Sequence, residues 1–315
     1  MNTKASVEAF APASMGNVGV GFDILGLAFK EPGDIVRVTP HEDQGAIMLS
    51  IDGDGGALPL DADKNTASVA VNAYLQQIEA PHGVRIELHK HLPLASGLGS
   101  SAASAVAAVV ATNALFNEPL SRTELLAACL EGEALVSGYH ADNVAPSLLG
   151  GFVLVNGITA ETIQALPVPA DLHLALVTPH VEVPTKEARA VLPESVSLKT
   201  MVAQTGMLAA MIDAVHRGDV QAMGVAMEGD CVIEPARTHL IPRLKQVRSA
   251  AKSAGAAGVV ISGAGPTLCA VCNEERKAQA VANAMSQVYF GAEIGVVSRY
   301  TQVDLQGARV IRIED

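Results

Sequence analysis

The part of the sequence that most constrains the fold is a glycine-rich segment, residues 93–104, which reads PLASGLGSSAAS. It follows an expected strand from Val84 to His89 and precedes an apolar helix expected from about Ser101 to Phe116. Gly97 and Gly99 allow a ligand to approach the backbone closely, because they carry no side chain. The first N–H groups of a helix lack partners, and the helix dipole adds positive potential there. The segment therefore predicts an anion site, with phosphate as the expected ligand.

The segment is also compatible with other interpretations. It fits the dinucleotide pattern GxGxxA, with the acidic Glu118 at a suitable distance downstream. That pattern requires a second parallel strand after the helix, whereas residues 117–121 look like a loop that leads into another helix. A purely structural helix start, with a serine cap and glycines that serve only the turn, is also compatible with the segment. No lysine follows the glycines, which excludes a Walker A loop.

Composition and charge limit the class of protein. The chain has 315 residues, which is long enough for two domains and a sizeable core. Its 49% hydrophobic and 17% charged residues are typical of a globular rather than a disordered protein. The net charge of −12 argues against a nucleic-acid partner, because phosphate backbones attract basic surfaces. Basic residues that bind a small anion should therefore stand out.

The sequence also bears on location. Residues 1–5 contain no apolar export segment, which predicts a cytoplasmic protein. The segment from Leu92 to Asn117 is uncharged and long enough to raise the question of a membrane span. Its proline, its glycines and its hydroxyl side chains argue against a span and favour a central buried helix. We therefore expect no membrane partner.

The four cysteines are too few and too scattered to form a disulfide framework. Cys269 and Cys272 have the CxxC spacing of redox and metal sites, but they lie in an expected strand. Residues three apart on a strand face opposite sides, so this pair predicts neither a redox site nor a metal site. Two small core residues are the expected interpretation.

A second glycine-rich segment, residues 11–26, combines four glycines with one amide, Asn17, and one carboxylate, Asp23. This composition suggests a backbone that folds closely around a small ligand. A glycine-rich hairpin with a solvated Asp23 is the alternative. A third segment, residues 262–267, reads SGAGPT and forms a turn between two expected strands.

Polar residues between these segments are further candidates. A helix that begins with the capping-box residues Ser121 and Glu124 is expected to continue to about Val136. Glu131 and Glu133 lie near its end, where the helix dipole disfavours acids, so either could serve a ligand or remain solvated. His140 and Asn143 are three residues apart and share one face if they lie on a helical turn. Asp142 between them is expected only to cap that turn.

Residues 156–171 are rich in glycine, threonine and proline, which predicts a domain boundary. We expect an N-terminal domain over residues 1–165 and a C-terminal domain over residues 166–315. The second half alternates strands and helices, which predicts an α+β domain.

The three glycine-rich segments have the order and approximate spacing found in the galactose, homoserine, mevalonate and phosphomevalonate (GHMP) kinases. The chain resembles the homoserine kinases of this family most closely. The mevalonate-type members usually carry a lysine in the first segment, where this chain has Ser14. The matching pieces are Ala11–Ser14, Gly21–Gly26, 93–101, His140–Pro146, Gly150 and Gly151, Thr185 with Arg189, Arg237, and 262–267.

The resemblance implies a two-domain α+β GHMP kinase fold. Its N-terminal domain is similar to the second domain of ribosomal protein S5, and its C-terminal domain is ferredoxin-like. It implies ATP-dependent phosphorylation of the L-homoserine hydroxyl to O-phospho-L-homoserine in threonine biosynthesis, with ATP and Mg²⁺ bound and a possible homodimer. The alternatives are a GHMP-type kinase with a mevalonate- or sugar-type substrate, and a non-catalytic ligand sensor on the same fold.

The resemblance also implies roles for single residues. Homoserine carries a carboxylate, an ammonium and a hydroxyl, and the planar guanidinium forks of Arg189 and Arg237 are candidates to bind the carboxylate. Asp23 is expected to pair with the ammonium or to orient the hydroxyl. The remaining substrate-binding candidates are Asn17, His140, Asn143, Thr185 and Gly263, and the catalytic candidates are Asp23, Asn17, Asn143 and Arg189.

The nucleotide site is implied in the same way. Ser101 and Glu133 are the expected Mg²⁺ ligands, with Ser100 and Glu131 as alternatives. Magnesium keeps waters and few protein ligands, which agrees with so sparse a site. Positioning and charge stabilisation dominate phosphoryl transfer, so Asp23 is expected to assist rather than to act as a strong base. The residues expected to bind the phosphates are Pro93, Leu94, Ala95, Ser96, Gly97, Leu98, Gly99, Ser100, Ser101, Ala102 and Ala103.

Overall fold

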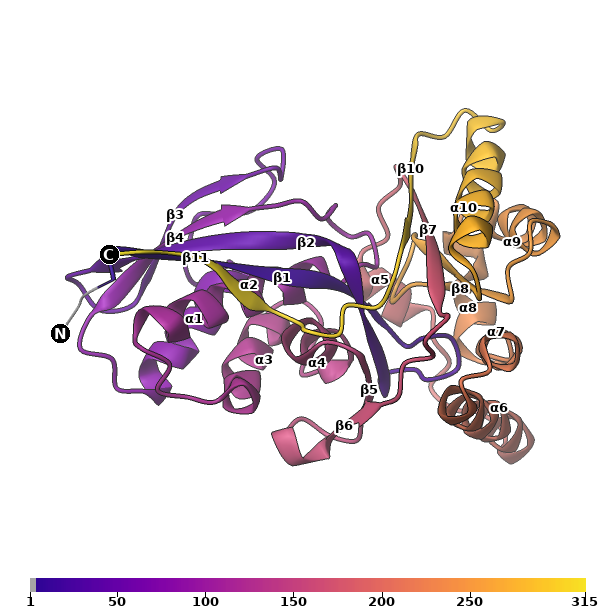
Figure 1. The fold of residues 1–315 in the computed structure, drawn as a ribbon, viewed down its shortest axis with the longest axis horizontal. Coiled ribbons are helices and arrows are strands. Elements are labelled where there is room, and N and C mark those ends of the chain that lie inside the picture. Colours follow the sequence, from indigo (N-terminus) through magenta and orange to yellow (C-terminus); the bar gives the residue numbers. More distant parts are fainter. Residues whose placement is uncertain (1–3) are drawn as a thin grey trace.

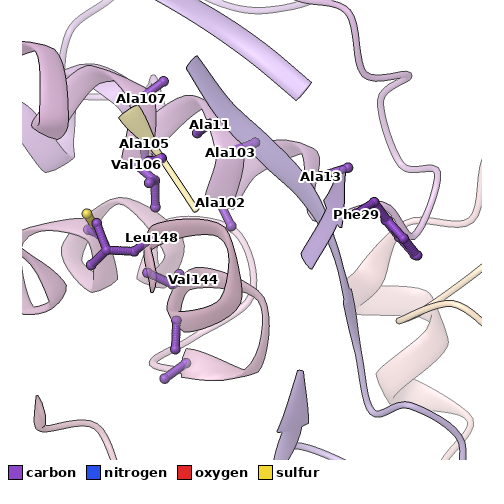
Figure 2. Packing of buried hydrophobic residues seen from close by; sticks show 14 of the residues in the cluster. Ala11, Ala13, Phe29, Ala102, Ala103, Ala105, Val106, Ala107, Val144 and Leu148 are labelled. Carbon is purple, nitrogen blue, oxygen red and sulfur yellow. The ribbon is translucent and has the colours of Figure 1, made fainter. Parts of the chain in front are cut away.

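Helix α2 (Ser100–Leu115) is the central element of the N-terminal half in the computed structural model, which describes residues 4–315. Every residue from 102 to 115 is buried, as the uncharged sequence predicts. Many of these side chains are alanine, so the helix can lie close to the strands β1 (Ser6–Gly16) and β2 (Leu25–His41). Figure 2 shows alanines of α2, among them Ala102 and Ala103, near Ala11 and Ala13 of β1.

A seven-stranded sheet forms one layer of this half, and helices cover one of its faces (Figure 1). Its main strand order is β11-β1-β2-β4-β3, and β5 joins β2 and carries β6. Strands β3 and β4 are parallel and are connected through α1, whereas the other pairs are antiparallel. The remaining elements of this half are β3 (Ala46–Asp52), α1 (Thr66–Gln77), β4 (Gly83–His89), α3 (Leu126–Ala134), α4 (Ala141–Leu149), β5 (Phe152–Val155) and β6 (Ile163–Leu166).

The C-terminal half is built on a four-stranded antiparallel sheet in the order β10-β7-β9-β8. One face packs on α9 and α10, and the other packs on α6 and α7. The elements are β7 (His173–Pro179), α5 (Thr185–Ala190), α6 (Leu198–Arg217), α7 (Val220–Met227), α8 (Ile233–Arg237), α9 (Leu244–Ser253), β8 (Gly258–Ile261), β9 (Leu268–Cys272), α10 (Glu275–Phe290), β10 (Val296–Thr301) and β11 (Arg309–Glu314). The α+β prediction is confirmed.

The last strand departs from the predicted division of the chain at residues 165 and 166. After β10 the chain returns to the N-terminal half, where β11 pairs antiparallel with β1. Figure 1 shows this return, with the C-terminus at the far end of the N-terminal sheet. Alternation of side chains along residues 309–314 indicates a strand but not its partner, so the pattern could not assign β11 to a sheet.

Three smaller expectations concern the cysteines, the membrane and the N-terminus. Cys269 and Cys272 are buried on opposite faces of β9, in two different hydrophobic clusters, as predicted. Within residues 4–315, no helix is both long and apolar enough to cross a membrane. The expectation about an export segment concerns residues 1–5, of which residues 1–3 lie outside the described part of the chain.

Candidate active site

A cavity of about 380 Å³ lies where the two halves meet, and all three glycine-rich segments contribute to its lining. Its wall also includes the beginning of α2, the end of α3, the beginning of α4 and the short helix α5. The site therefore collects residues that are more than 200 positions apart, such as Asn17 and Gly263.

The loop between β4 and α2 forms one wall, and its glycines are required by both conformation and space. Gly97 and Gly99 have φ angles of +77° and +62°, which are left-handed. A Cβ on Gly97 would lie 2.2 Å from the carbonyl oxygen of Ser262, and one on Gly99 would lie 2.1 Å from Ser14 Oγ. Helix α2 begins without a side-chain cap, so its first N–H groups remain for a ligand.

Hydrogen bonds hold this loop to the other two glycine-rich segments. The first segment and the turn at 262–267 both contact it from neighbouring sheets. Three bonds reach the loop: Ser14 N donates to Leu98 O (3.0 Å), Ser262 Oγ to Gly97 O (2.7 Å) and Thr267 N to Ser96 O (3.2 Å). A fourth, from Gly263 N to Gly16 O (3.3 Å), joins the other two segments to each other. The three segments are therefore connected by hydrogen bonds next to the beginning of α2.

Most residues of the predicted phosphate-binding stretch line the cavity. Residues 94–97 and 99–101 face it, and the last two of these belong to the first turn of α2. Leu98, Ala102 and Ala103 are buried behind them, and Pro93 is exposed and does not line the cavity. The buried residues can contribute only their backbone to a ligand.

The Asn17 side chain connects the first segment to the third. Its Oδ1 accepts a hydrogen bond from the backbone N–H of Asp23 (3.1 Å), and its Nδ2 donates to the carbonyl of Gly263 (2.9 Å). Asn17 and Asp23 both have positive φ angles, 70° and 60°, so the loop between them is held in a sparsely populated conformation. The Asn17 amide therefore positions Asp23 rather than facing the cavity with free donors and acceptors.

Asp23 and Arg189 form a bidentate ion pair at one end of the cavity. Arg189 donates from Nη2 to Asp23 Oδ1 (2.7 Å) and from Nη1 to Asp23 Oδ2 (3.1 Å). The His140 Nδ1 lies 3.6 Å from the same Oδ2. Burial lowers the pKa of His140 although Asp23 opposes the shift, so its imidazole is largely neutral at neutral pH.

Arg237 is almost fully buried, with 3% of its surface exposed. It donates from Nε to the carbonyl of Ala188 (2.9 Å) and from Nη1 to that of Gly263 (3.1 Å), which leaves Nη2 for a ligand. Both arginines lie over the Phe22 ring, with Cζ 5.4 Å from the ring centroid for Arg189 and 5.5 Å for Arg237. Burial and the nearby Arg189 lower the pKa of Arg237 to about 10, so it stays charged at neutral pH.

Asn143 and Thr185 also line the cavity. The Asn143 Oδ1 accepts from Ser14 Oγ (3.1 Å) and from the backbone N–H of Gly16 (3.1 Å), so its Nδ2 is the group left for a ligand. Thr185 is the first residue of α5. Every predicted substrate-binding residue therefore lines this one cavity.

A second carboxylate of the cavity wall, that of Glu133, lies beside the phosphate loop. Ser101 Oγ donates to Glu133 Oε2 (2.8 Å), and Ser137 Oγ donates to the other oxygen of the same carboxylate. Glu133 is 5% exposed, and burial raises its pKa. Within residues 4–315 its hydrogen-bond partners are hydroxyls rather than a cation, and no three acidic, histidine or cysteine side chains are placed so that they could hold a metal ion together. These hard oxygen donors fit a Mg²⁺ ion that takes its other ligands from phosphate and water.

The alternative magnesium ligands are placed differently. Glu131 is exposed, accepts a hydrogen bond from the Tyr139 hydroxyl (2.9 Å) and does not line the cavity. Ser100 lines the cavity, but its Oγ accepts from the Lys90 Nζ (2.6 Å). Ser101 and Glu133 are therefore the pair that the fold brings together.

The cavity wall also contains residues that were not among the predicted site residues, and Lys90, Phe22 and Asp142 are three of them. Lys90 directly precedes the glycine-rich loop, and in so acidic a chain a basic residue at the end of a strand was the available signal. Phe22 lies next to Asp23 but gave no chemical signal. Asp142 is 3% exposed, and burial, with Asp23 and Glu133 nearby, raises its pKa to about 7.

The chain matches known families over most of its length. Residues 65–151 match the model described as GHMP kinases N terminal domain, and residues 211–291 match GHMP kinases C terminal. Homoserine kinase of Chloroherpeton thalassium is 42% identical over 294 residues, which is 90% of this chain and 92% of that protein.

Solved structures agree with these matches. The crystal structure of homoserine kinase from Cytophaga hutchinsonii has a TM-score of 0.94 and 42% identity, covering 99% of both chains. A mevalonate kinase of L. major, in complex with R-mevalonate, has a TM-score of 0.71 at 16% identity and covers 96% of this chain and 97% of that one. The second likeness shows the fold alone. The likeness to homoserine kinases extends over the whole chain.

Proposed function

Because this chain belongs to the homoserine kinases of the GHMP kinase family, we propose that it transfers the γ-phosphoryl group of ATP to the hydroxyl of L-homoserine. The products are ADP and O-phospho-L-homoserine, an intermediate of threonine biosynthesis. The arrangement of charged groups in the cavity supports this proposal. The uncapped beginning of α2 lies in the same cavity as two guanidinium groups and the Asp23 carboxylate.

The triphosphate binds at the loop before α2. Its oxygens accept hydrogen bonds from the first N–H groups of α2, which also carry the positive end of the helix dipole. Ser101 and Glu133 hold the Mg²⁺, which neutralises phosphate charge when it is bound. The hydrogen bond between Ser101 Oγ and Glu133 Oε2 (2.8 Å) supports this assignment, because it places the two oxygens close enough to bind the same ion.

The adenine lies at the end of the cavity away from the arginines. Leu58 and Val136 are apolar residues of the cavity wall, which also includes Asn65 and Thr66 at the beginning of α1. A planar base fits such a surface, since ligand sites are mostly apolar with a few polar groups that fix orientation. This places the phosphates between adenine and homoserine.

Homoserine binds at the opposite end. Arg237 offers its Nη2 to the substrate carboxylate, because its other donors are held by backbone carbonyls. Asp23 provides negative charge for the ammonium, and Arg189 orients Asp23 through two hydrogen bonds. His140 and Thr185 complete the wall around the substrate. A substrate without an ammonium would leave the Asp23 charge poorly matched.

Catalysis comes from alignment and charge. The homoserine oxygen attacks the γ-phosphorus, the bond from the γ-phosphorus to the β–γ bridging oxygen breaks, and ADP is the leaving group. Asn143 directs its Nδ2 toward the reacting groups, because its Oδ1 is fixed by Ser14 and Gly16. The hydroxyl proton leaves late, to an oxygen of the transferred phosphoryl group or to water, so no strong base is required.

A coupled ADP-release assay with Mg·ATP tests the proposal. L-Homoserine is expected to support release at least about a hundredfold faster, in kcat/KM, than mevalonate or galactose, because those alcohols leave charged groups of the site unpaired. Preference for mevalonate or galactose would contradict the substrate assignment. Binding of ATP with no release of ADP for any alcohol would show a ligand sensor instead.

We also propose that the chain forms a homodimer. Helix α6 supports this, because it exposes the apolar side chains of Leu198, Met201 and Val202. Sedimentation equilibrium at the mass of one chain would contradict the dimer.

A further inference from the structure

Lys90 and Asp34 form an ion pair that is buried beneath the phosphate loop. Their side chains are 1% and 0% exposed, respectively. Asp34 belongs to β2, and Lys90 directly follows β4, the strand that leads into the loop. A buried ion pair requires desolvation of both charges, and two well-packed apolar residues often stabilise a fold as well or better. Stability alone therefore does not explain why an ion pair is buried beneath the phosphate loop, and a role in the site is the alternative.

The Asp34 carboxylate holds the beginning of the loop. Its Oδ1 accepts hydrogen bonds from the backbone N–H groups of His91 (3.0 Å) and Leu92 (3.1 Å). Its Oδ2 accepts from Ser104 Oγ (2.8 Å) and contacts the Lys90 Nζ. One carboxylate thus joins the start of the loop to the second turn of α2.

The Lys90 ammonium holds the other end of the loop. Its Nζ donates to the carbonyl oxygen of Ser100 (3.0 Å), to Ser100 Oγ (2.6 Å) and to Ser104 Oγ (2.9 Å). Ser100 is the first residue of α2, next to the proposed magnesium ligand Ser101. Lys90 is also one of the residues that line the cavity, so its charge lies close to the place where phosphate is expected.

We propose that Lys90 and Asp34 are positioning residues for the nucleotide phosphates. Together they fix the two ends of the loop, so that the first N–H groups of α2 and the Ser101 hydroxyl point into the cavity before nucleotide arrives. The pair therefore acts on the phosphates and not on the nucleoside. This inference rests on the proposed function.

Calorimetric titration of the full chain with Mg·ADP and with adenosine tests the inference. The variants are Lys90→Met, Asp34→Asn and the double variant, which removes both charges and so leaves no buried charge unpaired. We expect each variant to lose at least about tenfold in affinity for ADP while adenosine affinity changes less than about twofold. Lys252→Met is the matched control, because Lys252 pairs with Glu228 in the C-terminal half.

Equal affinity of the folded double variant and the unchanged chain for ADP would overturn the inference. A parallel loss of ADP and adenosine affinity would also overturn it, because the pair would then support the whole site. Loss of cooperative unfolding in the double variant would assign the pair to folding and overturn it as well. If the proposed function is wrong, the result is a different one: the unchanged chain will not release ADP when homoserine is added.

Discussion

At the scale of single residues, the bidentate pair of Asp23 and Arg189 determines which chemistry the acceptor end of the cavity supports. A carboxylate that accepts two hydrogen bonds from a guanidinium is held in a fixed orientation. That Asp23 assists the reaction rather than acting as a strong base stays a prediction. Arg189 lies 166 positions from Asp23 in the sequence, so no local pattern could connect the two residues.

The substitution Asp23→Asn is therefore expected to lower kcat by no more than about tenfold, or roughly 1.4 kcal/mol, because the amide keeps one acceptor for Arg189. KM for homoserine should rise, since the ammonium loses its countercharge. Steady-state kinetics separates the two parameters. A fall in kcat of about a thousandfold or more would instead identify Asp23 as a general base.

Glu133 is expected to act through the metal. Glu133→Gln should raise the Mg²⁺ concentration needed for half-maximal activity by at least about tenfold, because a neutral amide is a much weaker ligand for a hard cation. A magnesium titration at saturating ATP and homoserine measures the shift. Glu131→Gln is the control, since Glu131 is exposed and bound to Tyr139. Equal shifts in the two variants would argue against the assignment.

Asp142 should make stability depend on pH. Its folded-state pKa, about 7, lies above the ordinary value of 3.8. The folded state therefore holds this proton more tightly, and the stability it contributes is complete below about pH 4 and is lost as pH rises through 7. The loss amounts to about 4 kcal/mol at most.

Asp142→Asn should remove this loss. Urea unfolding at pH 5 and pH 8 is expected to show a smaller decrease in the free energy of unfolding than in the unchanged chain. Asp213→Asn, at an exposed position on α6, is the control and should keep the original decrease. The same decrease in Asp142→Asn would refute the assignment.

At the scale of elements, the glycine-rich loop was predictable and its partners were not. The spacing of Gly97 and Gly99 before an apolar run indicated both the turn and helix α2. The hydrogen bonds that join this loop to the turn at 262–267 connect residues about 165 positions apart, as in Ser262 Oγ to Gly97 O. Local patterns cannot report such contacts, so the linkage became visible only in the fold.

Alanine substitutions in the loop test this element directly. Gly97→Ala should abolish detectable ATP binding and lower stability by about 1 to 3 kcal/mol, because it meets a backbone carbonyl and forces a positive φ. Gly206→Ala is the control, since this glycine lies within α6 with open space around it. That change should leave ATP binding intact and raise stability by about 0.5 to 1 kcal/mol. Thermal unfolding and ATP titration of both variants provide the comparison, and normal ATP binding by Gly97→Ala would contradict it.

At the scale of the whole molecule, the sequence indicated two halves and most of their strands and helices. The partner of β11 was not predictable, because strand pairing depends on the fold of the rest of the chain. Lys90 and Asp34 illustrate the same limit at the site: one follows β4, the other lies in β2, and only the sheet places them together. The glycine-rich segments could be identified from the sequence because their residues act together within a few positions of the chain.

The central claim is that a triphosphate binds at the beginning of α2 and faces homoserine held by Arg237. A crystal structure with a non-hydrolysable ATP analogue, Mg²⁺ and L-homoserine tests it most directly. The account predicts phosphate oxygens on the N–H groups of Ser100 and Ser101, the metal on Ser101 and Glu133, and the amino acid's carboxylate on Arg237. Nucleotide bound outside this cavity, or homoserine bound away from Arg237, would contradict it.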